Sequence, residues 1–287
     1  MRGLLLLLLM LATTGCASMA PGGAAHCAWR VCVSHTDGPV GRDYLAINDE
    51  PVPVTIVMIF RSAENLQLPP GGRVETVVPP RATVDLAHLR KVRSGQRVGA
   101  SLALQIDLGS STNEGDPEFT YAMPFGGSEP RELVQGFGGS ETHLASMQYS
   151  LDFAMPIGTP ILAAREGTVL LVQDGFTEGG TDPALLERAN LVVIAHSDGT
   201  MASYGHLSKG IRVRRGDRVP EGALLGYSGE TGFAGQPHLH FHVGSRMLGE
   251  PGRTIPIRMR GSRGQVLDLK VGSRFEPAER RMHGVRR

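Results

Sequence analysis

The sequence has few aromatic residues and almost no excess charge. Only 5% of its 287 residues are aromatic and a single tryptophan is present, which argues against a row of aromatic side chains for stacking single-stranded nucleic acid. The formal net charge is +1, so the chain has no general electrostatic attraction for polynucleotides. We therefore expect no nucleic-acid partner. Hydrophobic residues reach 41%, which excludes a wholly disordered chain.

Helical periodicity is also scarce. The one candidate is the short stretch 182–189, where Asp182 can cap the first turn and Pro183 takes its first position. The chain instead has 38 glycines and 19 prolines, a share well above the usual one. So many turn residues favour short strands over long helices. We predict a mostly β fold.

Long apolar runs are missing except at the very start. The stretch 4–12 follows a single arginine and is too short to span a bilayer, so it has the layout of a secretory signal. Residues 13–17 (TTGCA) resemble a bacterial lipobox in which Cys16 would carry the lipid, although Thr13 stands where Leu is usual. We expect residues 1–16 to be a lipoprotein leader, with an ordinary signal peptide as the alternative. The protein would then be periplasmic and lipid-anchored to the outer membrane through Cys16.

Cysteine is rare, with three residues in the whole chain. If Cys16 carries lipid, Cys27 and Cys32 remain as an even pair that an oxidising compartment would allow to form a disulfide. Two free thiols are the alternative. The pair alone has too few ligands for a zinc site.

Alternating apolar residues indicate strands in the first half of the chain. The pattern of half-buried strands recurs in three stretches: 54–60, 102–108 and 119–125. Pro-Pro and Gly-Gly pairs separate them as turns. We predict that residues 27–127 form a small antiparallel β-domain of the sandwich type. It contains no cluster of reactive side chains, because His35 and His88 stand alone there.

A second domain is predicted from residue 128 to residue 252. The glycine-containing stretch 126–130 precedes it as a linker, and further short strands follow. From Arg253 to Arg287 the chain has ten Lys or Arg and three Asp or Glu. We interpret residues 253–287 as a solvated basic C-terminal tail, with weak attraction to anionic wall polymer or lipid headgroups as the alternative.

The stretch HLHFHV (238–243) is the most informative for chemistry. Alternate side chains of a strand share a face, so the three histidines would lie opposite the three apolar residues. Three imidazoles on one face are costly to bury without a metal or hydrogen-bond acceptors. Asp152 lies between apolar neighbours, with His143 nine residues before it. Imidazole and carboxylate are ligands that zinc accepts.

These parts stand in the order found in the lysostaphin/LytM-type zinc endopeptidases of peptidase family M23, which the chain resembles from His143 onward over roughly 110 residues. Each motif alone is weak, but their ordered conjunction is specific. The matching motifs are SLDFAMP (150–156), GTP (158–160), AAREGTV (163–169), NLVVIAH (190–196), YGHL (204–207), VRRGDRVPEG (213–222), GYSGETG (226–232) and PHLHF (237–241).

The resemblance implies a LytM-like antiparallel sheet domain with one Zn²⁺ per chain. The implied metal ligands are His143, Asp152 and His240. His206 and His238 would be the two catalytic histidines, with His238 favoured as general base and His206 as oxyanion stabiliser or proton donor. Tyr204 would orient or stabilise the oxyanion. Many members of the family place the first histidine four residues before the aspartate, whereas the gap here is nine.

Two further histidines need an interpretation. His196 matches a family position that holds no metal, and we expect a hydrogen-bonded histidine at a strand end. His242 would be a neighbour of the metal ligands.

The resemblance implies that the protein hydrolyses peptide cross-links of peptidoglycan, its expected partner. A leader of Gram-negative lipoprotein type would favour D-alanyl–diaminopimelate cross-links over oligoglycine bridges. A non-catalytic regulator that activates cell-wall amidases is the main alternative; such relatives lack metal ligands, whereas every position can be filled here. The pattern at 213–226 also resembles lipoyl-type carrier domains, but no lysine stands at the hairpin tip.

Overall fold

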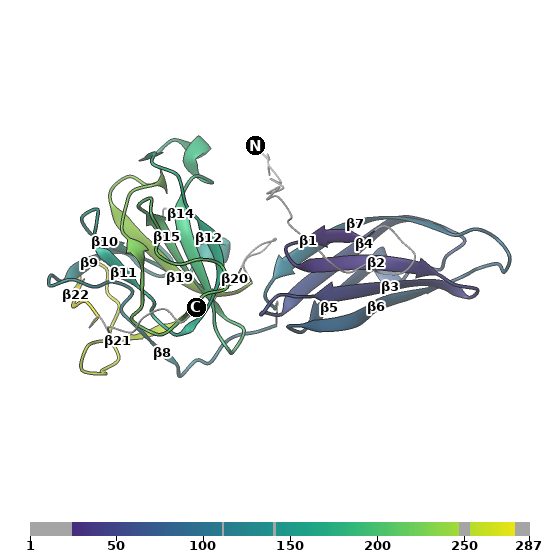
Figure 1. Cartoon of the computed structure of the whole chain (residues 1–287), viewed down its shortest axis with the longest axis horizontal. Coiled ribbons are helices and arrows are strands. Elements are labelled where there is room, and N and C mark those ends of the chain that lie inside the picture. The colour runs from purple at the N-terminus through teal and green to yellow at the C-terminus, as the bar shows by residue number, and fades with distance from the viewer. Residues whose placement is uncertain (1–24, 111, 140–141, 247–252, 279–287) are drawn as a thin grey trace. The chain divides into compact units, whose positions relative to one another are not determined.

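The computed structural model of the chain is built almost entirely of strands (Figure 1). It describes residues 25–110, 112–139, 142–246 and 253–278. Within these ranges the helical elements are three single 3₁₀ turns, and none is long and apolar enough to cross a bilayer. The predicted mostly β fold class is confirmed. The predicted leader, with Cys16, lies outside the described residues.

The chain folds as two compact units that divide between Ile106 and Asp107, about twenty residues before the linker suggested by the sequence. The reason is that Tyr121, Met123 and Phe125 are buried in the core of the second unit. The stretch 126–130 therefore lies within that unit and does not link the two units.

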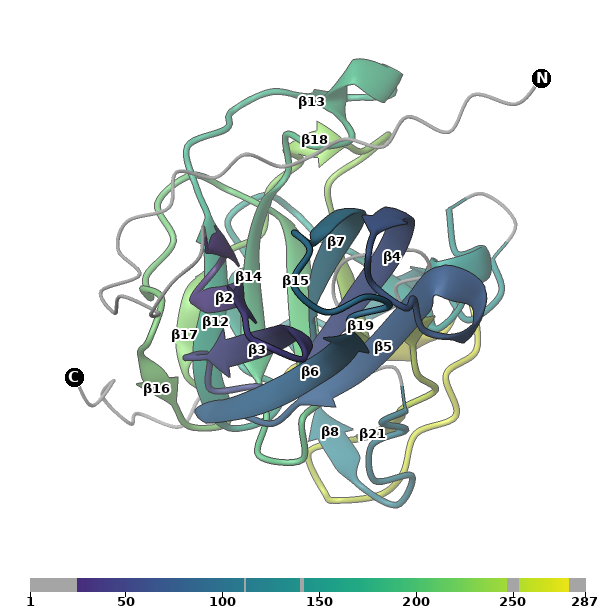
Figure 2. The same cartoon turned by 90° about the vertical axis from the view of Figure 1, so that its right-hand side faces the viewer.

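The first unit contains two antiparallel sheets, whose strands can be followed in Figure 2. One sheet has the order β1 (His26–Ala28), β2 (Val31–Asp37), β3 (Gly41–Asn48) and β6 (Ala82–Arg90). The other has the order β5 (Arg73–Val78), β4 (Val54–Glu64) and β7 (Gly99–Leu108), and the turn η1 (Pro70–Gly72) precedes β5. Tyr44 of β3 meets Phe60 of β4 edge to face at 5.6 Å between ring centroids. This contact joins the sheets into a sandwich.

The two cysteines of the first unit are bonded. Cys27 of β1 and Cys32 of β2 are direct cross-strand partners and form a disulfide. Of the two alternatives left open by the sequence, the structure has the disulfide.

One large sheet forms the frame of the second unit (Figure 1). Its order is β16 (Arg218–Val219), β12 (Gly167–Gln173), β14 (Asn190–Ala195), β15 (Met201–Leu207), β19 (His238–Arg246), β10 (Ser150–Ala154), β9 (Arg131–Gln135) and β22 (Arg274–Phe275), and β20 (Arg253–Thr254) pairs with β19. The short pairs around it are β11 (Pro160–Leu162) with β17 (Leu224–Tyr227), β13 (Gly179–Gly180) with β18 (Gly232–Phe233), and β8 (Thr120–Ala122) with β21 (Arg258–Arg260). The 3₁₀ turn η2 (Ala145–Met147) precedes β10. Strand β19 thus runs between β15 and β10.

The first residues of the second unit, 107–110, are bonded to the C-terminal end of β19. Ser110 donates a backbone hydrogen bond of 2.9 Å to Ser245, and Gly109 forms a bridge with Arg246. Arg246 also makes a buried ion pair with Asp107. Gly109 has φ +103°, and a Cβ there would overlap the carbonyl oxygen of Ser245. Only glycine suits this position.

Two local predictions need correction. The expected helix at 182–189 is a single 3₁₀ turn, η3 (Pro183–Leu185), in which Asp182 accepts a cap bond from Ala184. The cap is as predicted, but so few residues cannot sustain an isolated α-helix. The C-terminal part described by the structure is not a solvated tail, because Ile255, Met259 and Phe275 are buried in the second unit.

Candidate metal centre

Two neighbouring strands place Asp152 beside His240. The two residues are direct partners in the antiparallel pairing of β10 with β19. Their apolar neighbours on both strands are fully buried in the core, so period-2 alternation turns both polar side chains to the opposite face. Nδ1 of His240 lies 2.8 Å from Oδ1 of Asp152. The predicted division of β19 into an apolar and a histidine face is confirmed.

His143 reaches the same place from the loop between β9 and β10. Its Nδ1 is 2.8 Å from the carbonyl oxygen of Gly136, so Nδ1–H donates and Nε2 bears the lone pair. That Nε2 lies 3.2 Å from Oδ2 of Asp152, yet it is buried and has no hydrogen-bond partner. Gln135 fixes the loop by donating a 2.7 Å bond to Thr142.

These contacts fit a cation. Nε2 of His143, a carboxylate oxygen of Asp152 and a ring nitrogen of His240 lie within 4.8 Å of one another. A buried lone pair aimed at a carboxylate oxygen is unfavourable unless a positive ion lies between them. The three residues form a metal-binding His/Asp/His triad.

The two predicted catalytic histidines lie beside this triad. The ring centroids of His206 and His238 are 4.5 Å apart, and Nε2 of His238 is 3.9 Å from Oδ1 of Asp152. Nδ1 of His206 bonds to the carbonyl of Thr231 at 2.7 Å, and Nδ1 of His238 to that of Gln236 at 2.8 Å. Each ring therefore has its Nδ1 proton held by the backbone and an unprotonated Nε2.

His206 has an unusual backbone. Gly205 and His206 together face one residue of β14, because the pairing shifts between Val192 and Asn190. This is a β-bulge, and it puts His206 at φ +59°, a region that non-glycine residues seldom adopt. Such strain is common at functional sites. Burial, followed by the nearby His238 and His240, lowers the pKa of His206 to about 3.

Tyr204 is not part of this group, which contradicts its predicted role at the oxyanion. Its side chain is fully buried, packs against Phe241 at 5.1 Å between centroids, and accepts a 2.8 Å bond from the backbone N–H of Ala164. The reason is alternation: Tyr204 pairs with Phe241, and both lie on the core face. It is a structural residue.

The remaining histidines of this domain differ from each other. His196 follows the end of β14, and its Nδ1 bonds to the carbonyl of Glu166 at 2.9 Å, the structural arrangement we expected. His242 lies next to the triad, with Nδ1 at 3.1 Å from Nε2 of His240. The sequence did not point to Gly136, Thr231 or Gln236, because they act through backbone carbonyls.

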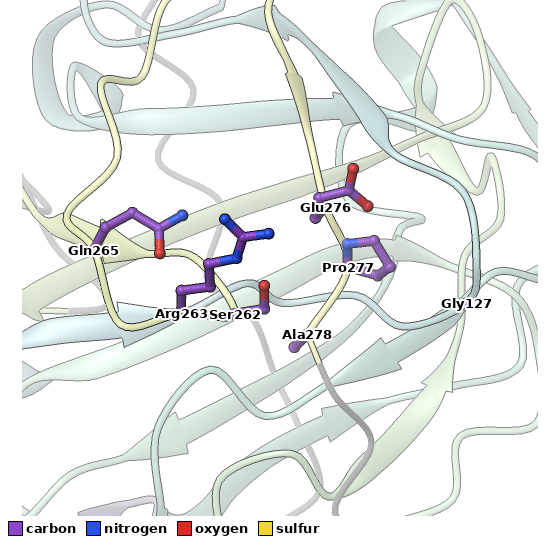
Figure 3. A pocket seen from close by; sticks show the side chains of 7 residues that line it. All are labelled: Gly127, Ser262, Arg263, Gln265, Glu276, Pro277 and Ala278. Atoms are coloured by element: carbon purple, nitrogen blue, oxygen red, sulfur yellow. The ribbon is translucent and has the colours of Figure 1, made fainter.

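A separate pocket lies against the C-terminal segment (Figure 3). It has a volume of about 530 Å³, and Arg263 and Gln265 face Glu276 and Pro277 across it. None of the predicted site residues lines it. The chemistry therefore belongs to the histidine face of β19.

Comparison with known proteins identifies the domain that holds this face. Residues 146–251 match the model of peptidase family M23. Peptidoglycan DD-endopeptidase ShyA of Vibrio cholerae is 40% identical over 92 residues, which is 32% of this chain and 19% of ShyA. Glycyl-glycine endopeptidase ALE-1 of Staphylococcus capitis is 41% identical over 96 residues, 32% of this chain and 23% of ALE-1. The structure of lysostaphin from Staphylococcus simulans aligns with 30% identity and a TM-score of 0.34, covering 43% of this chain and 47% of that one.

The chain thus spans about a fifth of the length of these two curated relatives. The matched region includes Asp152, His206, His238 and His240, and it begins three residues after His143. The ordered motifs, the triad and the family match all fall in one domain. Residues 146–251 therefore form a domain that matches peptidase family M23.

Proposed function

We propose that the protein is a zinc-dependent endopeptidase that hydrolyses peptide cross-links of bacterial peptidoglycan. The observation that carries the proposal is the buried, unpartnered Nε2 of His143, which faces Asp152 beside His240. The names of the relatives ShyA and ALE-1 support the substrate, because both are endopeptidases and the former acts on peptidoglycan.

The donor set fits one Zn²⁺ per chain. Two imidazole nitrogens and a carboxylate oxygen are accepted zinc ligands, and three protein ligands are typical of a catalytic site with one open position. When bound, zinc supplies polarisation of the scissile carbonyl and a water nucleophile at neutral pH.

Proton transfer falls to the paired histidines. Because Nδ1 of His238 is bonded to the carbonyl of Gln236, the Nε2 of the neutral ring can accept a proton from the attacking water. His238 can then pass this proton to the leaving amine. His206, with its low pKa, stays neutral and orients the water as a hydrogen-bond acceptor. This assignment keeps His238 as the base and changes the role expected for His206, because its Nε2 has no proton to give an oxyanion.

We further propose that the bond is a D-alanyl–diaminopimelate cross-link and that the protein is exported. The basis is the predicted lipoprotein leader at residues 1–16, because a leader of Gram-negative type would favour this bond over oligoglycine bridges. A lipid on Cys16 would hold the enzyme on the periplasmic side of the outer membrane, within reach of the peptidoglycan layer.

Digestion of purified peptidoglycan tests the proposal. The chain from residue 17, with and without a zinc chelator, is incubated with diaminopimelate-type sacculi and, separately, with pentaglycine-bridged wall. Mass spectrometry should show chelator-sensitive loss of cross-linked dimers from the first substrate only. Cleavage of pentaglycine would contradict the bond. Zinc binding without any cleavage would favour an amidase-activating protein, which an added amidase would reveal.

A further inference from the structure

The metal ligand His240 has a second imidazole behind it. Its Nε2 lies 3.1 Å from Nδ1 of His242, and the two ring centroids are 5.3 Å apart. We infer that His242 is a positioning residue. Its Nδ1 accepts a hydrogen bond from the Nε2–H of His240, which leaves Nδ1 of His240 free to bind the metal. The inference rests on the metal-binding part of the proposed function and is independent of the substrate.

The need for such a residue follows from the imidazole itself. A neutral ring has one N–H and one lone pair, so Nδ1 can bind a metal only if the proton sits on Nε2. In His240, however, Nδ1 lies 2.8 Å from Oδ1 of Asp152, and this carboxylate favours a proton on Nδ1. Two tautomers of His240 therefore compete. The acceptor at His242 stabilises the one that the metal requires.

The strand pairing keeps His242 in place. As the residue two positions after His240 on β19, it lies on the same face. Its cross-strand partners are Ser150 of β10 and Ser203 of β15, so both flanking strands limit its movement. Because Nδ1 of His242 accepts a hydrogen bond, the ring proton of His242 is on Nε2. His242 thereby stabilises the tautomer of His240 that has its proton on Nε2.

The choice of imidazole as acceptor affects the charge of the centre. Residues behind metal-binding histidines are commonly carboxylates or backbone carbonyls. A carboxylate at position 242 would add a second negative charge next to Asp152. An imidazole that accepts through Nδ1 provides the hydrogen bond without a carboxylate's charge.

Zinc affinity is the direct test. The full chain and the variants His242→Ala and His242→Gln are titrated with zinc against a chromophoric chelator. Loss of the acceptor in His242→Ala should weaken binding by roughly 10- to 100-fold. His242→Gln, whose amide oxygen can accept the same bond, should recover most of the affinity. His88→Ala in the first unit is the matched control and should bind like the unchanged chain.

A spectroscopic measurement on the unchanged chain tests the inference without a variant that could fail to fold. In the zinc-loaded full chain with ¹⁵N-labelled histidine, NMR should find the His240 proton on Nε2 and that of His242 on Nε2 as well. A proton on Nδ1 of His242, two zinc ions per chain, or equal affinity of His242→Ala and the unchanged chain would each overturn the inference. A chain that binds zinc as described but leaves peptidoglycan intact would refute the proposed function and leave this inference standing.

Discussion

Each imidazole of the centre has one nitrogen held by the backbone or by a neighbouring side chain. The Nδ1–H groups of His143, His206 and His238 donate hydrogen bonds to main-chain carbonyls. In His240, Nδ1 contacts Asp152 and Nε2 contacts His242. The backbone therefore sets the tautomer of the first three rings, whereas His240 lies between two possible acceptors. Function at this scale depends on which nitrogen carries a proton.

Asp152→Asn tests the carboxylate of the triad. The substitution keeps the shape but removes the charge that balances a cation between two buried imidazoles. We expect zinc affinity to fall by at least about 100-fold and cleavage to be lost. Metal content after dialysis, measured by atomic absorption, checks this. Asp85→Asn, on β6 of the first unit, is the control; an Asp152→Asn protein that keeps one zinc per chain would disprove the assignment.

Tyr204→Phe separates stability from chemistry. The buried N–H of Ala164 would lose its acceptor, which costs about 1–3 kcal/mol of unfolding free energy. Because Tyr204 lies on the core face, kcat and zinc affinity should remain unchanged. Urea unfolding and steady-state kinetics measure the two effects. A large drop in kcat with unchanged stability would restore Tyr204 to the oxyanion.

His196 makes the stability of the second unit depend on pH. Burial, together with the charge of Arg165, lowers its pKa from 6.5 to about 4. As the pH falls below 6.5, His196 becomes protonated in the unfolded chain but stays neutral in the folded protein. The free energy of unfolding therefore decreases as the pH is lowered to about 4, and then levels off. The loss is about 3 kcal/mol. In His196→Gln, urea unfolding between pH 7 and 4 should show a correspondingly smaller loss; an unchanged loss would contradict the prediction.

At the scale of elements, the centre depends on how β19 is flanked. Strand β10 brings Asp152, β15 brings His206 through its bulge, and the loop before β18 brings the carbonyl of Thr231 to His206. Thr231 is itself fixed: its hydroxyl donates to the carbonyl of Leu207 and accepts from the N–H of Asn190. The hydroxyl of Thr231 thus fixes the carbonyl that orients the ring of His206.

Thr231→Val probes this control. The isosteric change removes both hydroxyl bonds, so the loop and its carbonyl shift relative to His206. A misplacement of a fraction of an ångström to 1 Å should reduce kcat by on the order of tenfold to a hundredfold, while the zinc content stays at one per chain. Single-turnover kinetics on preloaded enzyme would show the loss. Unaltered kcat would mean that His206 needs no such support.

Periodicity in the sequence predicted the strands and the faces of β19 and β10, because alternation alone determines which side chains share a side. The family motifs led to the triad, including His143 despite its long spacing from Asp152. The bulge at His206 was beyond such reasoning, since one extra residue in a strand leaves no mark on composition. Tyr204 was misassigned because a motif neighbour need not be a neighbour in space.

The prediction from net charge was wrong at the C-terminus. Ten basic residues suggested a tail, but Ile255, Ile257 and Met259 alternate there and are buried. A few apolar side chains on one face outweigh many exposed charges, which stay solvated at little cost.

At the scale of the whole molecule, the two units should respond to different agents. The Cys27–Cys32 bond closes a short loop in the first unit, which stabilises the fold by about 2 kcal/mol by restricting the unfolded chain. The His/Asp/His triad found among the described residues lies in the second unit. In calorimetry we expect a reductant to lower one transition and a chelator to lower the other. Cys27→Ser/Cys32→Ser should reproduce the effect of the reductant; a chelator that shifts both transitions equally would count against separate units.

The attachment of residues 107–110 to β19 has a mechanical consequence. A pull on the N-terminal unit passes along the chain to Asp107, Gly109 and Ser110, whose bonds end on Ser245 and Arg246. Those residues close the strand that carries His238, His240 and His242. Tension therefore acts on β19, which carries the metal ligand His240, before it acts on the neighbouring strands of the sheet. The ion pair of Arg246 with Asp107 is the first contact to bear the load.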